Sequence, residues 1–151
     1  MRSASTNEQG SATVEFVAIG VLLLIPIVYL VIVLGRVQSA AFAADGSARA
    51  AARAFVAATD DVEARSRAET AVRLGLLDQG FTDPADGDLF IECDRPDACL
   101  TPGGQVRVLV QVRVVLPGVP RFLDRVVPAR ITVRAAQLAV IDEFRPRSGA
   151  G

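Results

Sequence analysis

Apolar positions run without a break from Phe16 to Leu34, nineteen residues with no charged or amide side chain. As a helix, this run would be roughly 28 Å long, close to the hydrocarbon thickness of a bilayer. Pro26 near its centre predicts a kink. A single carboxylate, Glu15, precedes the run, and Gly10 lies five residues before it. We therefore expect a transmembrane helix over residues 11–35, preceded by a polar leader, residues 1–10.

Beyond the membrane run, the alanine-rich segment 36–58 keeps a helical pattern. If Gly46 is tolerated, one helix continues from near Ser11 to Ala58. Its apolar residues recur every three or four positions, which predicts a stripe along one face. That stripe can pack in the core of a domain or against neighbouring subunits, and core packing is expected for Phe55. Its residues are Val37, Ala41, Ala44, Ala48, Ala51 and Phe55.

A second helix is expected to begin at Asp60. Asp60 and Glu63 have the spacing of a capping box, in which each side chain satisfies a backbone N–H of the other residue. Gly80 is a natural place for the helix to end. The apolar face of this helix is expected to use Val62, Ala68, Val72 and Leu76.

The period then changes from helical to the alternation of strands. Residues 88–93, 105–116 and 130–141 are strand candidates, and the middle one places valines 106, 108, 110, 112 and 114 on one face. Three prolines make 117–128 a connection, and 145–151 is expected to be a flexible tail. The fold class is α+β: a transmembrane helix continuing into one domain, residues 36–144, with a second helix and a small antiparallel sheet.

The composition argues against several kinds of binding and catalytic site. The net charge is −1 and all sixteen cationic side chains are arginine, so nothing points to nucleic acid. Histidine, the commonest general base and metal ligand, is absent. Asp83, Asp86 and Asp88 surround Gly87, but their spacing does not fit a calcium loop and indicates a solvated turn. We expect no catalytic residues, no cofactor and no metal.

The two cysteines, Cys93 and Cys99, flank Pro96. They can close a small disulfide loop, which would suit an oxidising, extracytoplasmic compartment, or they can remain free thiols. Two cysteines without histidine are too few for a zinc site.

The flanks of the apolar run leave two further alternatives. A cleaved secretory signal is disfavoured, because the run exceeds the usual 7–15 residues and the Ala-x-Ala match at 41–43 follows only after Arg36. Arginines follow the run more closely than they precede it, and the positive-inside rule would then keep the C-terminal part in the cytoplasm. A domain this long can translocate regardless of flanking charge, and the cysteines favour the outside.

The segment Gly10-Ser-Ala-Thr-Val-Glu15-Phe16 resembles the type IV prepilin signal. The resemblance implies that a membrane aspartic peptidase, the prepilin peptidase, cuts after Gly10 on the cytoplasmic side. Ser11 would become the new N-terminus and Glu15 the fifth residue, beside the aromatic Phe16. Pairing between the new amine and Glu15, within one subunit or between two, would make both charges cheaper to bury.

Residues 10–36 look more specifically like the TadE-like family, the minor pilins or pseudopilins of tight-adherence (Flp) pili. Family members often carry proline early in the span, whereas here Gly20 lies in that region and the proline is Pro26. Major pilins of these systems are far shorter after the span, so the long C-terminal part favours a minor subunit. The resemblance implies other Tad/Flp pilins, the pilus assembly platform and membrane lipid as partners.

The leading hypothesis is therefore a structural subunit for pilus assembly. It would lie in the bacterial cytoplasmic membrane as a single-pass protein, with its N-terminus cytoplasmic and its domain extracytoplasmic, and it could also enter the pilus. The alternative is a single-span membrane protein with an extracytoplasmic binding module unrelated to pili. An enzyme is the third and least supported reading.

Overall fold

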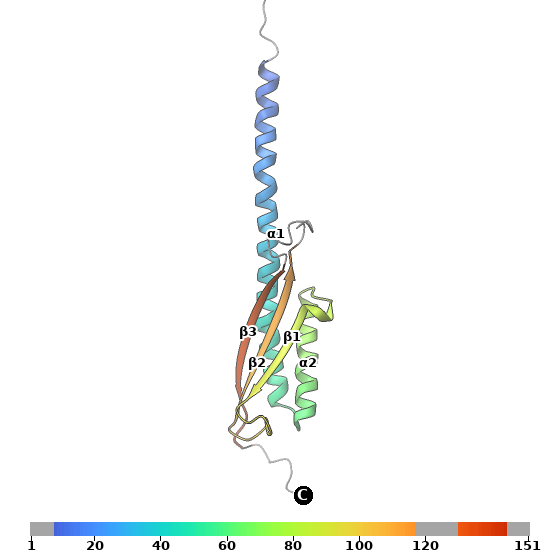
Figure 1. Cartoon of the computed structure of the whole chain (residues 1–151), viewed down its shortest axis with the longest axis vertical. Coiled ribbons are helices and arrows are strands. Elements are labelled where there is room, and N and C mark those ends of the chain that lie inside the picture. The colour runs from blue at the N-terminus through green and yellow to red at the C-terminus, as the bar shows by residue number, and fades with distance from the viewer. Residues whose placement is uncertain (1–7, 117–129, 145–151) are drawn as a thin grey trace, which may run out of the picture. The chain divides into compact units, whose positions relative to one another are not determined.

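A computed structural model describes residues 8–116 and 130–144 (Figure 1). The predicted connection 117–128, the tail 145–151 and most of the leader lie outside these residues. The chain forms two compact units, one ending at Gly35 and the other beginning at Arg36. The elements in order are α1 (Glu8–Val56), α2 (Asp61–Asp78), a 3₁₀ turn η1 (Pro84–Asp86), β1 (Gly87–Cys93), β2 (Gln105–Val115) and β3 (Arg130–Val140).

Helix α1 is continuous, as expected, and neither Pro26 nor Gly46 ends it. In the second unit its inner face is built almost entirely from alanine, and Phe55 is 1% exposed. The expected stripe was wrong at Ala41, which is exposed, and Val37 is only half-buried. The buried face instead follows the 3.6-residue helical period more closely. Its residues are Ala40, Ala43, Ala44, Ser47, Ala48, Ala51, Ala52 and Phe55.

The start of α2 is capped, but not by a reciprocal capping box. The Asp60 carboxylate accepts a hydrogen bond from the Glu63 backbone N–H at 2.8 Å, as expected. The Glu63 carboxylate, however, accepts from the N–H and the hydroxyl of Thr59, one residue further back, at 2.8 and 2.5 Å. Arg67 also forms an ion pair with Glu63 at 2.7 Å.

These contacts lower the pKa of Glu63, the Thr59 hydroxyl contributing most and the Thr59 N–H next. Because the pKa is lowered in the folded state, the stabilisation is present above the ordinary glutamate pKa of about 4.3 and is lost as the pH falls through the folded-state value.

Helix α2 ends in a Schellman motif. Gly80 adopts a left-handed conformation, with φ of +80°, and donates to the Leu77 carbonyl, while Phe81 donates to Leu76. The buried face of α2 comprises Ala64, Ala68, Val72 and Leu76. The expectation for Val62 was wrong: Val62 is 82% exposed, because it lies in the first turn, away from the row that begins at Ala64.

The sheet has the order β1-β2-β3, and both pairs are antiparallel. The alternation predicted for β2 is confirmed, since all five inward valines from Val106 to Val114 are buried. β1 and β3 place half-buried apolar residues beside them, including Leu89, Ile91 and Ala135. Helix α2 lies along β1, and the second-unit part of α1 lies behind β2 and β3 (Figure 1).

Gly75 of α2 packs closely against Ser47 of α1. A Cβ at Gly75 would overlap the Ser47 hydroxyl oxygen, whereas the Ser47 Cβ would stand at 3.4 Å, an ordinary contact. Among the described residues the buried Ser47 hydroxyl has no hydrogen-bond partner. The packing at this point therefore depends on a glycine opposite a single oxygen atom.

We expect Gly75→Ala to lower the free energy of unfolding by about 1–2 kcal/mol, because the added methyl overpacks the crossing. In a Ser47→Ala background the same change should instead stabilise the domain by about 0.5–1 kcal/mol, since alanine is the better helix former and the overlap is gone. Hydrogen exchange of the β2 amides in the detergent-solubilised chain measures both. Equal effects of Gly75→Ala in the two backgrounds would contradict this packing.

Candidate functional site

The segment from Gly10 to Phe16 lies in the first turns of α1. The helix begins at Glu8, so the backbone of Gly10 and Ser11 is already helical. The side chains of Glu15 and Phe16 are both exposed, Phe16 to 78%. Consecutive side chains in a helix point about 100° apart, so Glu15 and Phe16 occupy different faces.

The apolar run behind this segment is uncovered. Every residue from Ala12 to Ile32 is exposed, and Leu22 reaches 75%. A soluble monomer rarely exposes a contiguous apolar surface of this extent. Helix α1 is long and apolar enough to cross a membrane, although a signal sequence near the N-terminus has the same character. Because the run is not buried, it differs from the core helix of a soluble domain.

Glu15 is the only acidic residue between Glu8 and Asp45. Within the described residues no salt bridge involves it; the ion pairs found there join Arg49 to Asp45, Arg67 to Glu63 and Arg113 to Asp88. A carboxylate at the edge of an apolar span is costly to bury without a cation. Glu15 therefore lies exposed at the start of the apolar surface, outside the ion pairs of the described residues.

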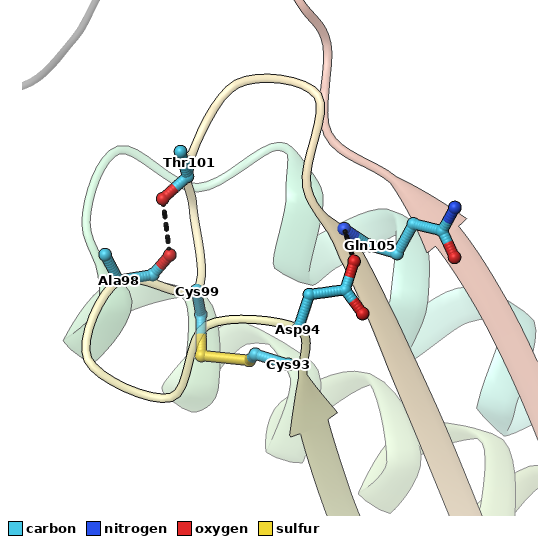
Figure 2. Close-up of a disulfide and its surroundings, with 6 residues drawn as sticks. All are labelled: Cys93, Asp94, Ala98, Cys99, Thr101 and Gln105. Atoms are coloured by element: carbon cyan, nitrogen blue, oxygen red, sulfur yellow. Dashed lines mark hydrogen bonds between the residues drawn. A yellow bond between two sulfur atoms is a disulfide. The ribbon is translucent and has the colours of Figure 1, made fainter.

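The structure joins Cys93, the last residue of β1, to Cys99 by a disulfide, with the two Cα atoms 5.3 Å apart (Figure 2). In the chain-entropy account a loop of this length contributes about 2 kcal/mol. Both cysteines are partly buried and pack against the core. The disulfide fits an oxidising compartment.

Hydrogen bonds hold the disulfide loop at the end of the sheet. Asp94 and Gln105 bond reciprocally: the Gln105 N–H donates to the Asp94 carboxylate (Figure 2), and the Asp94 N–H donates to the Gln105 carbonyl, both at 3.1 Å. The Thr101 hydroxyl donates to the Ala98 carbonyl at 2.6 Å. Further on, Ile141 donates to the Gly104 carbonyl and ties the loop to the residue that follows β3. The loop therefore has a structural role: its bonds join the residues at one end of β1, β2 and β3.

The acidic turn has structural partners. Asp83 accepts from the Ala85 N–H at 2.9 Å and caps η1. Asp88 is ion-paired with Arg113, which also donates to the Ala85 carbonyl at 2.5 Å. No group of metal-ligating side chains occurs among the residues that the structure describes. These contacts fix the conformation of the turn that leads into β1.

Comparison with known protein families, with curated proteins and with solved structures finds no match to this chain. The functional reading therefore rests on the chain's own residues: Gly10, Ser11, Glu15 and Phe16 in the first unit, and the disulfide in the second.

Four residues with structural roles were missed from the sequence. Thr59 was not recognised as a partner of Glu63, although a threonine before an acidic helix start is a usable signal. Gly75 and Ser47 carry no local signal, because their contact exists only once the two helices pack. Arg113 carries no local signal for its contacts with Asp88 and Ala85, because they exist only once β1 and β2 pair.

Proposed function

We propose that the chain is a minor pilin or pseudopilin: a membrane-anchored structural subunit for assembly of a tight-adherence (Flp) pilus, processed after Gly10. The observation that supports this most strongly is the helix that carries an uncovered apolar surface directly behind Glu15. Such a surface suits lipid before assembly and neighbouring helices afterwards. Membrane lipid, a prepilin peptidase, other Tad/Flp pilins and the assembly platform are the proposed partners.

Helical geometry would bring the N-terminus created by the proposed cut close to Glu15. Ser11 and Glu15 are four residues apart in α1, so they lie on one face, one turn from each other. A new ammonium group at Ser11 would therefore lie close to the Glu15 carboxylate. An acidic side chain in the first turn also interacts favourably with the helix dipole. The peptidase must open only a terminal turn, where few intrahelical hydrogen bonds exist.

The proposed orientation puts the second unit outside the bacterial cytoplasmic membrane and the N-terminus in the cytoplasm. The disulfide between Cys93 and Cys99 supports it, since such bonds persist in oxidising compartments. The arginines that follow the span oppose it, but long domains translocate largely regardless of such charges. From there the subunit can stay at the platform or enter the fibre.

A binding module unrelated to pili is the second candidate. It is favoured by a groove of about 670 Å³ between α2 and β1. The groove is mainly apolar, with Val72, Leu76, Phe81, Leu89 and Phe90 among its lining residues.

Intact mass of the chain purified from native membranes should correspond to a start at Ser11. Gly10→Val should block processing and leave the leader attached, because the peptidase is proposed to require glycine at the cut. Gly20→Val is the matched control, since nothing lies within 4 Å of a Cβ at Gly20, and its mass should again begin at Ser11. A native chain that retains residues 1–10 would refute the processing step.

Glu15→Ala should leave cleavage intact but reduce co-purification with other pilins at least several-fold, because the Ser11 amine would lose its carboxylate partner. Glu8→Ala is the control, since it removes a carboxylate from the part of α1 that the cut discards. Pull-down from membranes, with intact mass to verify processing, measures both effects. Unchanged assembly of the Glu15 variant would contradict the pairing and indicate that Glu15 is only a solvated residue in the headgroup region.

A further inference from the structure

The two outer edges of the sheet carry opposite charges. On the face of the sheet away from the buried valines, β1 presents Asp88 and Glu92, and β3 presents Arg130 and Arg134. Glu92 and both arginines are exposed, whereas Asp88 is half-buried. Each pair is separated by four residues, so the two pairs have the same spacing along their strands.

The helices beside the two edges reinforce the difference. Arg49 and Arg53 of α1 line a hollow against Leu138 of β3. On the opposite side, Glu69 of α2 and Asp83 line the groove next to β1. Charges of the other sign are also present: Arg73 lines the β1 groove, Arg113 forms an ion pair with Asp88, and Asp45 forms an ion pair with Arg49.

Both edges are open in the described part of the chain, because its three strands pair only in the order β1-β2-β3. An open edge presents unpaired backbone N–H and C=O groups that can accept another strand. Charges along such an edge block pairing with an edge of like charge and permit pairing with one of opposite charge.

We propose that β3 of one copy pairs with β1 of a second copy of this chain. The other two pairings of these edges are disfavoured, since β1 with β1 brings acids together and β3 with β3 brings arginines together. If the second sheet continues the first with its helices on the same side, β3 and the incoming β1 run parallel, because both are antiparallel to β2.

One register then satisfies both charged pairs. Arg130 faces Asp88 of the second copy and Arg134 faces its Glu92, since both pairs have the same spacing. This interface joins two different surfaces, so a pair of copies retains one free β1 edge and one free β3 edge, and the association can extend into a row of subunits. The inference goes beyond the proposed function, because it does not depend on processing at Gly10 or on a pilus.

Charge reversal tests the pairing in the full chain. Donor- and acceptor-labelled copies are reconstituted in liposomes of neutral lipid, and energy transfer is followed against protein density. In the proposed register, Glu92→Arg alone places an arginine opposite Arg134, and Arg134→Glu alone places a glutamate opposite Glu92. We expect each variant by itself to associate on the order of tenfold more weakly than wild type. An equal mixture of the two should recover wild-type association within about threefold, because every contact in an alternating row is again between opposite charges.

Asp78→Arg is the matched control, since it makes the same charge change as Glu92→Arg at the end of α2, in the groove between α1 and α2. It should associate as wild type does. Raising the salt should weaken wild-type association and reduce the differences among variants.

Because Glu92 lies opposite Arg107 in the sheet, the neutral variants Glu92→Gln and Arg134→Gln are measured as well. Slow hydrogen exchange in β2 verifies that each variant is folded. Smaller losses in the neutral variants, in the same direction, support the pairing. Three results would overturn it: no self-association of the wild type, equal association in all variants, or a mixture of folded reversal variants as weak as either one alone.

Discussion

The apolar surface of α1 between Ala12 and Ile32 is the constraint on which the account depends. No part of the described chain covers it, so the cost of leaving it in water must be removed by lipid or by other helices. Once that stretch is in a membrane, Gly10 and Glu15 precede it at one surface and the chain from Arg36 follows it at the other. The processing and pairing chemistry proposed for the first unit has meaning only in that setting.

The second unit shows how a small domain stabilises itself with few large side chains. Alanines on α1 and the buried valines of β2 belong to one core, in which Phe55 is the largest fully buried side chain among the described residues. A core of this kind contributes little surplus stability, so helix caps and the disulfide make up a larger share of the free energy of unfolding. The Thr59–Glu63 contact, the Schellman turn at Gly80 and the disulfide therefore stabilise the ends of elements that the core reaches least.

The sequence predicted the elements well and their buried faces less well. The long helix, the second helix and the three strands were all expected, because periodicity and the Asp60 and Gly80 signals are local. Ala41 and Val62 were misplaced for a physical reason: where alanine fills most positions, or where the first turn is free of the core, hydrophobicity does not identify the buried side. The Ser47–Gly75 contact and the opposite charges of the sheet edges depend on packing and register. Gly10 and Glu15 were found by motif, since no contact among the described residues identifies them.

Residue-by-residue accessibility in native membranes tests the central claim most directly. Single cysteines at Ile25 and Gln38 in the full chain can be probed with a membrane-impermeant maleimide on spheroplasts, since the native cysteines are joined in a disulfide. The account predicts that the cysteine at Ile25 reacts only after detergent is added and that the one at Gln38 reacts from outside. Labelling of Ile25→Cys without detergent, or of Gln38→Cys only after lysis, would contradict it.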